Sequence, residues 1–334
     1  MKKRTLITAV QYLIFLGLGI FIIYRMFHNM SSDEKTQMLA SVKQTRLLLF
    51  IPVIIGGFFS HFFRALRWRL LLKPLNIYPG VINTTLSVLI GYIVNLLVPR
   101  MGEIAKCTVL ARYEKVPADK MVGTIVAERA FDVLTLGVIT VAAFVLQSDV
   151  IGIWVDSNIG AFAAKRSVFI MAILGLIAFV LLLIFLYRRN KESKVAKFLK
   201  GMADGISSII KMKDRGMFLL YTVLIWGLYW FMVMIGFWSL PATDHLGGLT
   251  ALVVLVFGSV GMIVTPGGLG AYPVLVAQIL LCYAISISDG NALGWVSWLG
   301  QTAVIIILGL ISLVVLPIYN RNKQRHAQAP VDTK

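Results

Sequence analysis

Charged side chains occur in two short motifs inside otherwise apolar stretches of the chain, and they are the residues best suited to chemistry. In the motif EIAK, Glu103 and Lys106 are three residues apart. In AERAFD, Glu128 and Asp132 are four residues apart, with Arg129 between them. Each spacing places the residues on one face of a helix. Because ionised groups are costly at membrane depth, we expect both faces to point into the protein and to pair there.

These motifs allow two readings, which are compatible with each other. In the first, basic side chains contact the phosphate of a lipid headgroup, while carboxylates contact a cationic part of the lipid or carry protons. In the second, the charges form a neutral network that only braces the fold. Such a network can exchange its internal partners for the charges of a ligand. The candidate residues are Arg100, Gly102, Glu103, Lys106, Glu128, Arg129 and Asp132.

Two Pro/Gly segments interrupt apolar runs, VPRMGEIAK around Pro99 and TPGGLGAYP around Pro266. They are 167 residues apart in a chain of 334. Interrupted segments at matching places in two halves indicate a transporter-like binding site near the bilayer midplane. The second segment carries no charge, so its exposed backbone amides would hold an anion. Its candidate residues are Pro266, Gly267, Gly268 and Gly270, and the alternative is a simple turn between packed helices.

The composition places the elements that carry these motifs in a membrane. Hydrophobic residues make up 58% of the chain and charged residues only 14%, which indicates an all-α polytopic membrane protein. We expect about six spanning helices and two re-entrant helical hairpins, at residues 81–111 and 249–286. The expected spans are residues 6–24, 47–70, 122–147, 167–187, 217–240 and 294–316. The alternative is that Pro and Gly merely kink two ordinary helices.

The charge distribution favours cytoplasmic N- and C-termini. With hairpins at both breaks, the predicted inner segments carry 23 Lys and Arg and the outer loops carry 6, as the positive-inside rule requires. We therefore predict one integral membrane domain over residues 1–320, followed by a disordered cytoplasmic tail at 321–334. Within the domain, an inverted repeat comprises residues 47–147 and 217–316, joined by a connector helix at 167–187.

A third cluster of polar and aromatic residues precedes the first hairpin, in the run HFFRALRWRLLLK. Arg64, Arg67 and Trp68 fall on one side of a helix, and Arg69 is close by. Their place at the predicted inner interface favours anionic lipid headgroups. We expect these four residues to anchor the helix at the lipid interface, and only secondarily to form a substrate entrance.

The sequence contains no pattern typical of catalysis or of a cofactor. Cys107 and Cys282 are isolated from each other, and the four histidines are scattered, which argues against a metal site. No HExxH motif, serine elbow or phosphate-binding loop is present. We therefore expect a protein that is not an enzyme and that uses neither a metal nor another cofactor.

Four runs in this sequence resemble one known family. RALRWRLLL, VPRMGEIAKCTVLAR, VAERAFDVL and TPGGLGAY are similar, in this order, to the lysylphosphatidylglycerol synthase transmembrane region, or flippase-like domain, family. The resemblance covers nearly the whole chain and implies a helical domain of the inner membrane. Its best-known relative translocates aminoacylated phosphatidylglycerol, and others accompany glycosyl transfer to polyprenyl lipids. Lys106 stands where the family often has Arg, which keeps the charge but loses the bidentate fork.

We therefore expect a flippase-like lipid translocase of the cell inner membrane. It would move a phospholipid or a polyprenyl-linked amphiphile through a polar cavity between the two hairpins. Its expected partners are membrane lipids with an anionic or phosphate-bearing headgroup and a separate lipid-modifying or glycosyltransferase enzyme, with no nucleic acid. The alternative is a lipid-binding accessory protein for such an enzyme that transports nothing.

Overall fold

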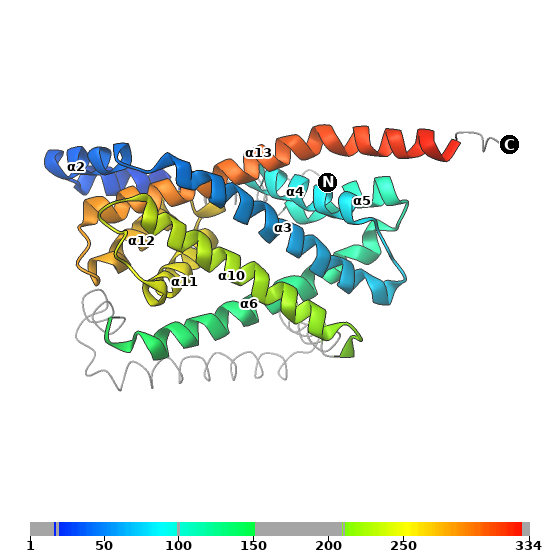
Figure 1. Ribbon diagram of the computed structural model, residues 1–334, viewed down its shortest axis with the longest axis horizontal. Coiled ribbons are helices and arrows are strands. Elements are labelled where there is room, and N and C mark those ends of the chain that lie inside the picture. Colours follow the sequence, from blue (N-terminus) through cyan, green and yellow to red (C-terminus); the bar gives the residue numbers. More distant parts are fainter. Residues whose placement is uncertain (1–16, 18–19, 99–100, 151–208, 210, 329–334) are drawn as a thin grey trace.

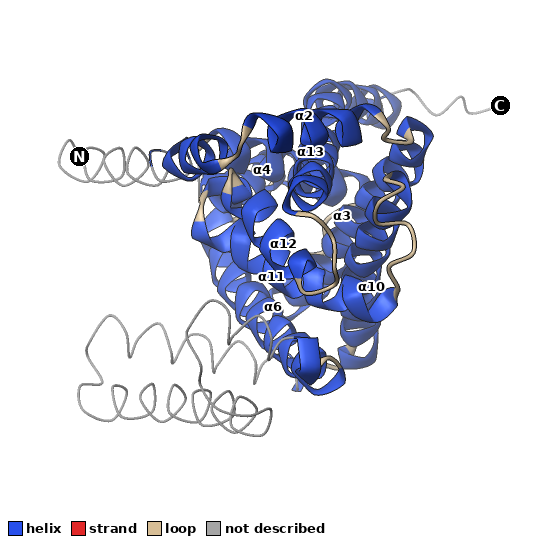
Figure 2. Ribbon diagram, turned by 90° about the vertical axis from the view of Figure 1, so that its left-hand side faces the viewer, coloured by secondary structure: helices blue, strands red, loops and turns tan. Residues whose placement is uncertain are grey.

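The computed structural model describes residues 17, 20–98, 101–150, 209 and 211–328, and this part of the chain is helical with no strand. Figure 1 shows helices packed along one another, and Figure 2 shows the loops that join them. Two of the expected spans, 6–24 and 167–187, lie largely or wholly outside the described residues, as do Pro99 and Arg100.

Four described helices are long and apolar enough to cross a membrane. They are α3 (Phe50–Leu72), α6 (Ala118–Leu146), α10 (Arg215–Ser239) and α13 (Ile287–Gln328). These helices confirm the spans expected at 47–70, 122–147, 217–240 and 294–316. The chain is thus an all-α polytopic membrane protein.

The two interrupted stretches are helical hairpins, as expected. The first consists of α4 (Val81–Leu97) and α5 (Met101–Glu114), and the second of α11 (Gly248–Val264) and α12 (Ala271–Leu281). Each of these helices is shorter than the roughly 20 residues needed for a full crossing. The second hairpin turns through a short 3-10 helix, η3 (Pro266–Gly268). There Gly267 and Gly268 adopt positive φ angles of 61° and 76°, which glycine tolerates best.

The helix contacts follow the same order in both halves. In the first, α3, α4, α5 and α6 each contact the next helix, and in the second α10, α11, α12 and α13 do the same. Between the halves, α4 contacts α13 and α11 contacts α6. We refer to α3–α6 as repeat one and to α10–α13 as repeat two.

Helices α3 and α10 run antiparallel, side by side (Figure 1). Near one end of the pair the Arg46 backbone N–H donates to the Ser239 carbonyl. Further along α3, the Arg67 guanidinium donates to the Thr222 hydroxyl. Because the two helices hold equivalent positions in their repeats, their opposite directions are what an inverted arrangement requires.

One expectation about the C-terminus was wrong. Residues 321–328, assigned to a disordered tail, continue α13 to Gln328, while residues 329–334 lie outside the described part. Pro317 does not end the helix. The segment after it is rich in Arg, Lys, Gln and Ala, which favour helix. Asn320 also exchanges two side-chain hydrogen bonds with Asn83 of α4, at 2.8 and 3.0 Å.

Candidate functional site

Glu128 lies at the centre of a buried ion cluster. Its side chain is fully buried and accepts from three cations. The N···O distances are 3.3 Å to Arg64, 3.4 Å to Arg67 and 2.8 Å to Lys106. A buried carboxylate is stable only when it is paired in this way.

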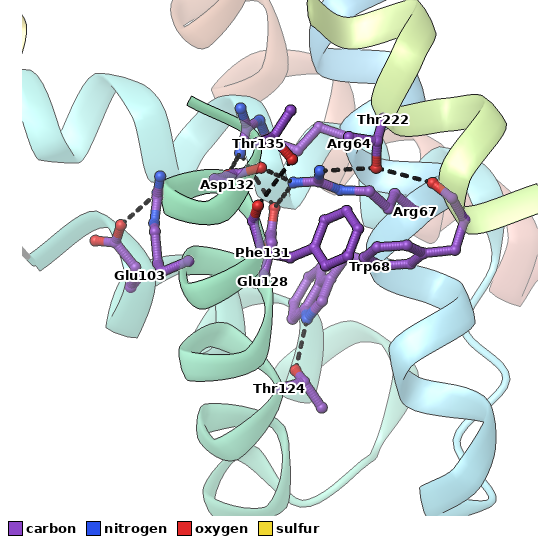
Figure 3. Close-up of polar contacts among 12 residues, drawn as sticks. Arg64, Arg67, Trp68, Glu103, Thr124, Glu128, Phe131, Asp132, Thr135 and Thr222 are labelled. Carbon is purple, nitrogen blue, oxygen red and sulfur yellow. Dashed lines mark hydrogen bonds and ion pairs between the residues drawn. The ribbon is translucent and has the colours of Figure 1, made fainter. Parts of the chain in front are cut away.

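Asp132 forms the second anionic position of the cluster, one helical turn further along α6. It pairs with Arg64 at 2.8 Å and with Arg67 at 2.6 Å. The two arginines are three residues apart on α3, so their guanidinium groups meet the face of α6 that carries both carboxylates (Figure 3). Helix α10 completes the cluster, because Thr222 accepts from Arg67 and Tyr229 accepts from Arg64.

The expected lipid anchors Arg64, Arg67 and Trp68 are therefore interior residues, and that assignment was wrong. Arg67 and Trp68 have no exposed surface and Arg64 is only 5% exposed. The indole N–H of Trp68 donates to Thr124 at 2.8 Å, and the Lys106 ammonium lies over its ring, 4.6 Å from the centroid. Arg69 donates to the Pro79 carbonyl and is partly buried. This face of α3 points into the protein because its arginines form ion pairs with the carboxylates of α6.

Glu103 and Arg129 form a separate ion pair beside the cluster, at 2.6 Å. Figure 3 shows Glu103 apart from Glu128 and Asp132. Thus Glu103 and Lys106, expected on one helical face, pair with different residues of α6. Among the described residues, the cluster and this pair together hold four cations and three carboxylates. The assembly therefore carries one excess positive charge.

A cavity of about 410 Å³ lies between the two repeats. Helices α3, α4, α6, α10, α11, α12 and α13 all contribute to its wall. Its charged lining residues Arg64, Arg129 and Asp132 belong to repeat one, whereas the wall from repeat two is apolar apart from uncharged polar residues such as Tyr272 and Gln301. The volume is in the range of small-molecule binding pockets.

Comparison with known families places the chain in a class. The family model described as the lysylphosphatidylglycerol synthase TM region matches residues 9–309. The chain belongs to this family. No curated protein matches the chain, and no solved structure does. The resemblance noted in the four sequence runs is thereby confirmed.

The family match covers both hairpins and every residue of the ion cluster. The lysylphosphatidylglycerol synthase TM region is a membrane domain by its description, in agreement with the four membrane-length helices. Within the described part of this family member, no group of three or more His, Cys, Asp or Glu side chains is placed to hold a metal ion.

The glycine turn of the second hairpin uses two of its amides for its own hydrogen bonds. The amides of Gly268 and Leu269 donate to the carbonyls of Thr265 and Pro266 within the turn, so these two are not available to an anion. Pro266, Gly267, Gly268 and Gly270 are not among the described residues that line the large cavity. Instead, the indole N–H of Trp298 donates to the Gly267 carbonyl at 2.7 Å.

The two hairpins approach each other at this turn. A Cβ atom on Gly267 would lie 3.7 Å from Cδ1 of Leu96, near the end of α4. Leu96 and Gly267, the described residues beside the two breaks, therefore lie close together. Gly102, also a candidate, packs against Gly91 inside the first hairpin so closely that a Cβ atom would overlap the Gly91 carbonyl.

Sequence reasoning missed the aromatic part of the cavity wall. Tyr92, Trp226, Tyr229 and Tyr272 all line it, and the ring of His61 lies 4.2 Å from that of Tyr92. Aromatic residues are common in membrane helices, so their type alone carries no signal. The three-residue spacing of Arg64 and Arg67 in an apolar run could have indicated that α3 faces the cavity. The same spacing also fits an interfacial anchor.

Proposed function

We propose that the protein is a lipid translocase that moves a phosphate-bearing headgroup through the cavity between its two repeats, while the lipid tails remain in the bilayer. The observation that carries this proposal is the cavity of about 410 Å³ with charged residues on one wall and apolar residues on the other. Membership of the lysylphosphatidylglycerol synthase TM region family supports the same class of activity.

The excess positive charge beside the cavity favours an anionic ligand. Arg129 lines the cavity and is 46% exposed, so its guanidinium group is accessible to a phosphate, with which it forms strong charge-assisted hydrogen bonds. Arg64 also lines the cavity, but its terminal nitrogens already donate to Glu128, Asp132 and Tyr229. In this proposal Arg129 binds the headgroup and Arg64 supplies a fixed positive field.

The proposed location in the membrane is based on the charge distribution. An inner-membrane protein with both termini in the cytoplasm fits the excess of Lys and Arg in its predicted inner segments. We propose no catalytic reaction and no resident cofactor. A separate lipid-modifying enzyme or glycosyltransferase would supply or consume the lipid.

Reconstitution tests this function. The purified protein would be placed in liposomes with a fluorescent phospholipid in both leaflets, and an impermeant quencher would be added outside. We expect the inner-leaflet fluorescence to decay faster than in protein-free liposomes and to be slowed by Arg129→Gln. Arg46→Gln is the matched control, because Arg46 belongs to an exposed ion pair with Asp244 and is not among the cavity-lining residues.

The outcomes of this assay separate the two candidate functions. Accelerated decay that depends on Arg129 supports a translocase. Lipid binding without accelerated decay supports the accessory role, and the absence of both rejects a function in lipid handling.

A further inference from the structure

Among the ion pairs of the site, Arg129–Glu103 differs from the rest in exposure. The side chains around Glu128 and Asp132 are at most 12% exposed, whereas Arg129 is 46% and Glu103 is 21% exposed. Buried pairs cannot lose one partner without leaving an uncompensated charge. The Arg129–Glu103 pair is open to the cavity and the cleft, and an ion pair in contact with water contributes little to stability. Arg129–Glu103 is therefore the pair that can change partners at the lowest cost.

The position of this pair also separates its two members. Arg129 lines both the large cavity and a small adjoining cleft. Glu103 lines the cleft and is not among the described residues that line the cavity. An anion that arrives from the cavity thus reaches the guanidinium group that Glu103 contacts from the cleft. A carboxylate and a phosphate are alternative partners for the same guanidinium fork.

Glu103 is one of several contacts that hold the first hairpin, so its ion pair with Arg129 can open while α5 stays in place. Glu103 is the third residue of α5, which begins at Met101, while α4 ends at Leu97. The beginning of α5 is also held by the close packing of Gly102 on Gly91 and, one turn further on, by Lys106, which pairs with Glu128. The ion pair therefore joins the beginning of α5 to α6 at its most exposed point.

We propose that Glu103 acts as a built-in competitor for the ligand phosphate, occupying the anion site on Arg129 until a headgroup displaces it. This inference rests on the proposed function and assigns a regulatory role within the same site. Displacement makes the phosphate the partner of Arg129 and leaves the Glu103 carboxylate in the cleft. The added negative charge then offsets the one excess positive charge of the assembly.

The proposal makes an unusual prediction, namely that the loss of a charged site residue tightens binding. The experiment measures the affinity of the detergent-purified protein for dihexanoyl phosphatidylglycerol, a short-chain anionic lipid, by titration calorimetry. We expect Glu103→Gln to bind this lipid more tightly, by up to about five-fold, the factor that corresponds to an exposed ion pair. Arg129→Gln should bind it at least about ten-fold more weakly, because a charge-assisted contact is lost.

A matched control and a second variant complete the test. Asp244→Asn removes the carboxylate of the exposed pair with Arg46 and should leave the affinity unchanged. Glu103→Ala should repeat the tightening of Glu103→Gln, which protects the result against a local effect of the new amide. Uncharged dihexanoylglycerol should bind all variants equally.

The possible results are distinct. Unchanged or weaker binding in both Glu103 variants overturns the competitor role, while Arg129→Gln can still support the headgroup site. If neither the wild-type protein nor any variant binds the anionic lipid, the proposed function itself fails, and this inference with it.

Discussion

The two hairpins have the same place in their repeats but are held by different forces. The first is joined to its neighbours by ions, since Lys106 and Glu103 of α5 pair with Glu128 and Arg129 of α6. The second is held by close backbone packing. A Cβ atom on Gly294 of α13 would come within 2.5 Å of Cα of Pro273 in α12. Small residues of this kind allow helices in membranes to approach closely.

This difference in contacts suits the two repeats to different roles. Packing of backbone on backbone has one good arrangement and leaves no partner to exchange. Ion pairs can exchange an internal carboxylate for an external anion. Repeat one is therefore suited to ligand binding, and repeat two to holding the cavity in shape.

The largest effect should follow from a substitution of Glu128, at the centre of the ion cluster in repeat one. Glu128→Gln leaves Arg64, Arg67 and Lys106 with the single carboxylate of Asp132. Loss of one partner of a buried pair costs about 3–5 kcal/mol. We expect a large fall in the thermal unfolding temperature of the purified protein. Glu103→Gln is the control with little change, and equal stability of the two variants would contradict the division between buried and exposed pairs.

Repeat two should lose stability when a larger side chain is added at a closely packed glycine. Gly294→Val places a side chain against Pro273, and overpacking of this kind costs about 1–3 kcal/mol. Gly227→Val is the matched control, because no atom lies within 4 Å of the Cβ position there. Thermal unfolding of both variants checks the prediction. If Gly294→Val unfolds at the temperature of Gly227→Val, the second hairpin does not depend on close packing.

Arg129→Gln should separate function from stability. Its ion pair is exposed, so we expect a loss of no more than about 1 kcal/mol in the free energy of unfolding. Lipid movement in liposomes should nevertheless fall at least about ten-fold, because the headgroup loses a charge-assisted contact. A variant that transports at the wild-type rate would remove Arg129 from the site.

The smallest effects should come from two hydrogen bonds, one between the two repeats and one within repeat two. Tyr229→Phe removes the acceptor of Arg64, and Trp298→Phe removes the donor to Gly267. Each should cost about 1 kcal/mol of stability. We expect only Tyr229→Phe to change the affinity for an anionic lipid, because it acts on a cation that lines the cavity. Calorimetry with both variants compares a hydrogen bond at the charged wall of the cavity with one at the turn of the second hairpin. An equal change in affinity would contradict the prediction.

Local features of the sequence predicted the local features of the fold. The Pro and Gly residues near positions 99 and 266 predicted two breaks. The structure agrees, because α4 ends at Leu97 before α5 begins at Met101, and α11 ends at Val264 before the turn at Pro266–Gly268. The charges of α5 and α6 had to pair inside the protein because of their depth. The four described spans followed from length and apolar composition alone.

The remaining features depend on contacts between distant segments. Arg67 meets Asp132 across 65 positions of sequence and Thr222 across 155. Helical periodicity gave the face of α3 that carries the arginines, but not the helix that covers this face. The internal hydrogen bonds of the glycine turn, from the amides of Gly268 and Leu269, also could not be foreseen. The cavity arises only when helices of both repeats are assembled.

The length of α13 has a mechanical consequence. Its 42 residues form a rod of about 63 Å at 1.5 Å per residue. Gly294 touches α12 near the beginning of the rod, Gly309 lies against Ile93 of α4, and Asn320 bonds Asn83 beyond it. Both hairpins thus contact the same helix, α13. A tilt of α13 would therefore displace both hairpins together.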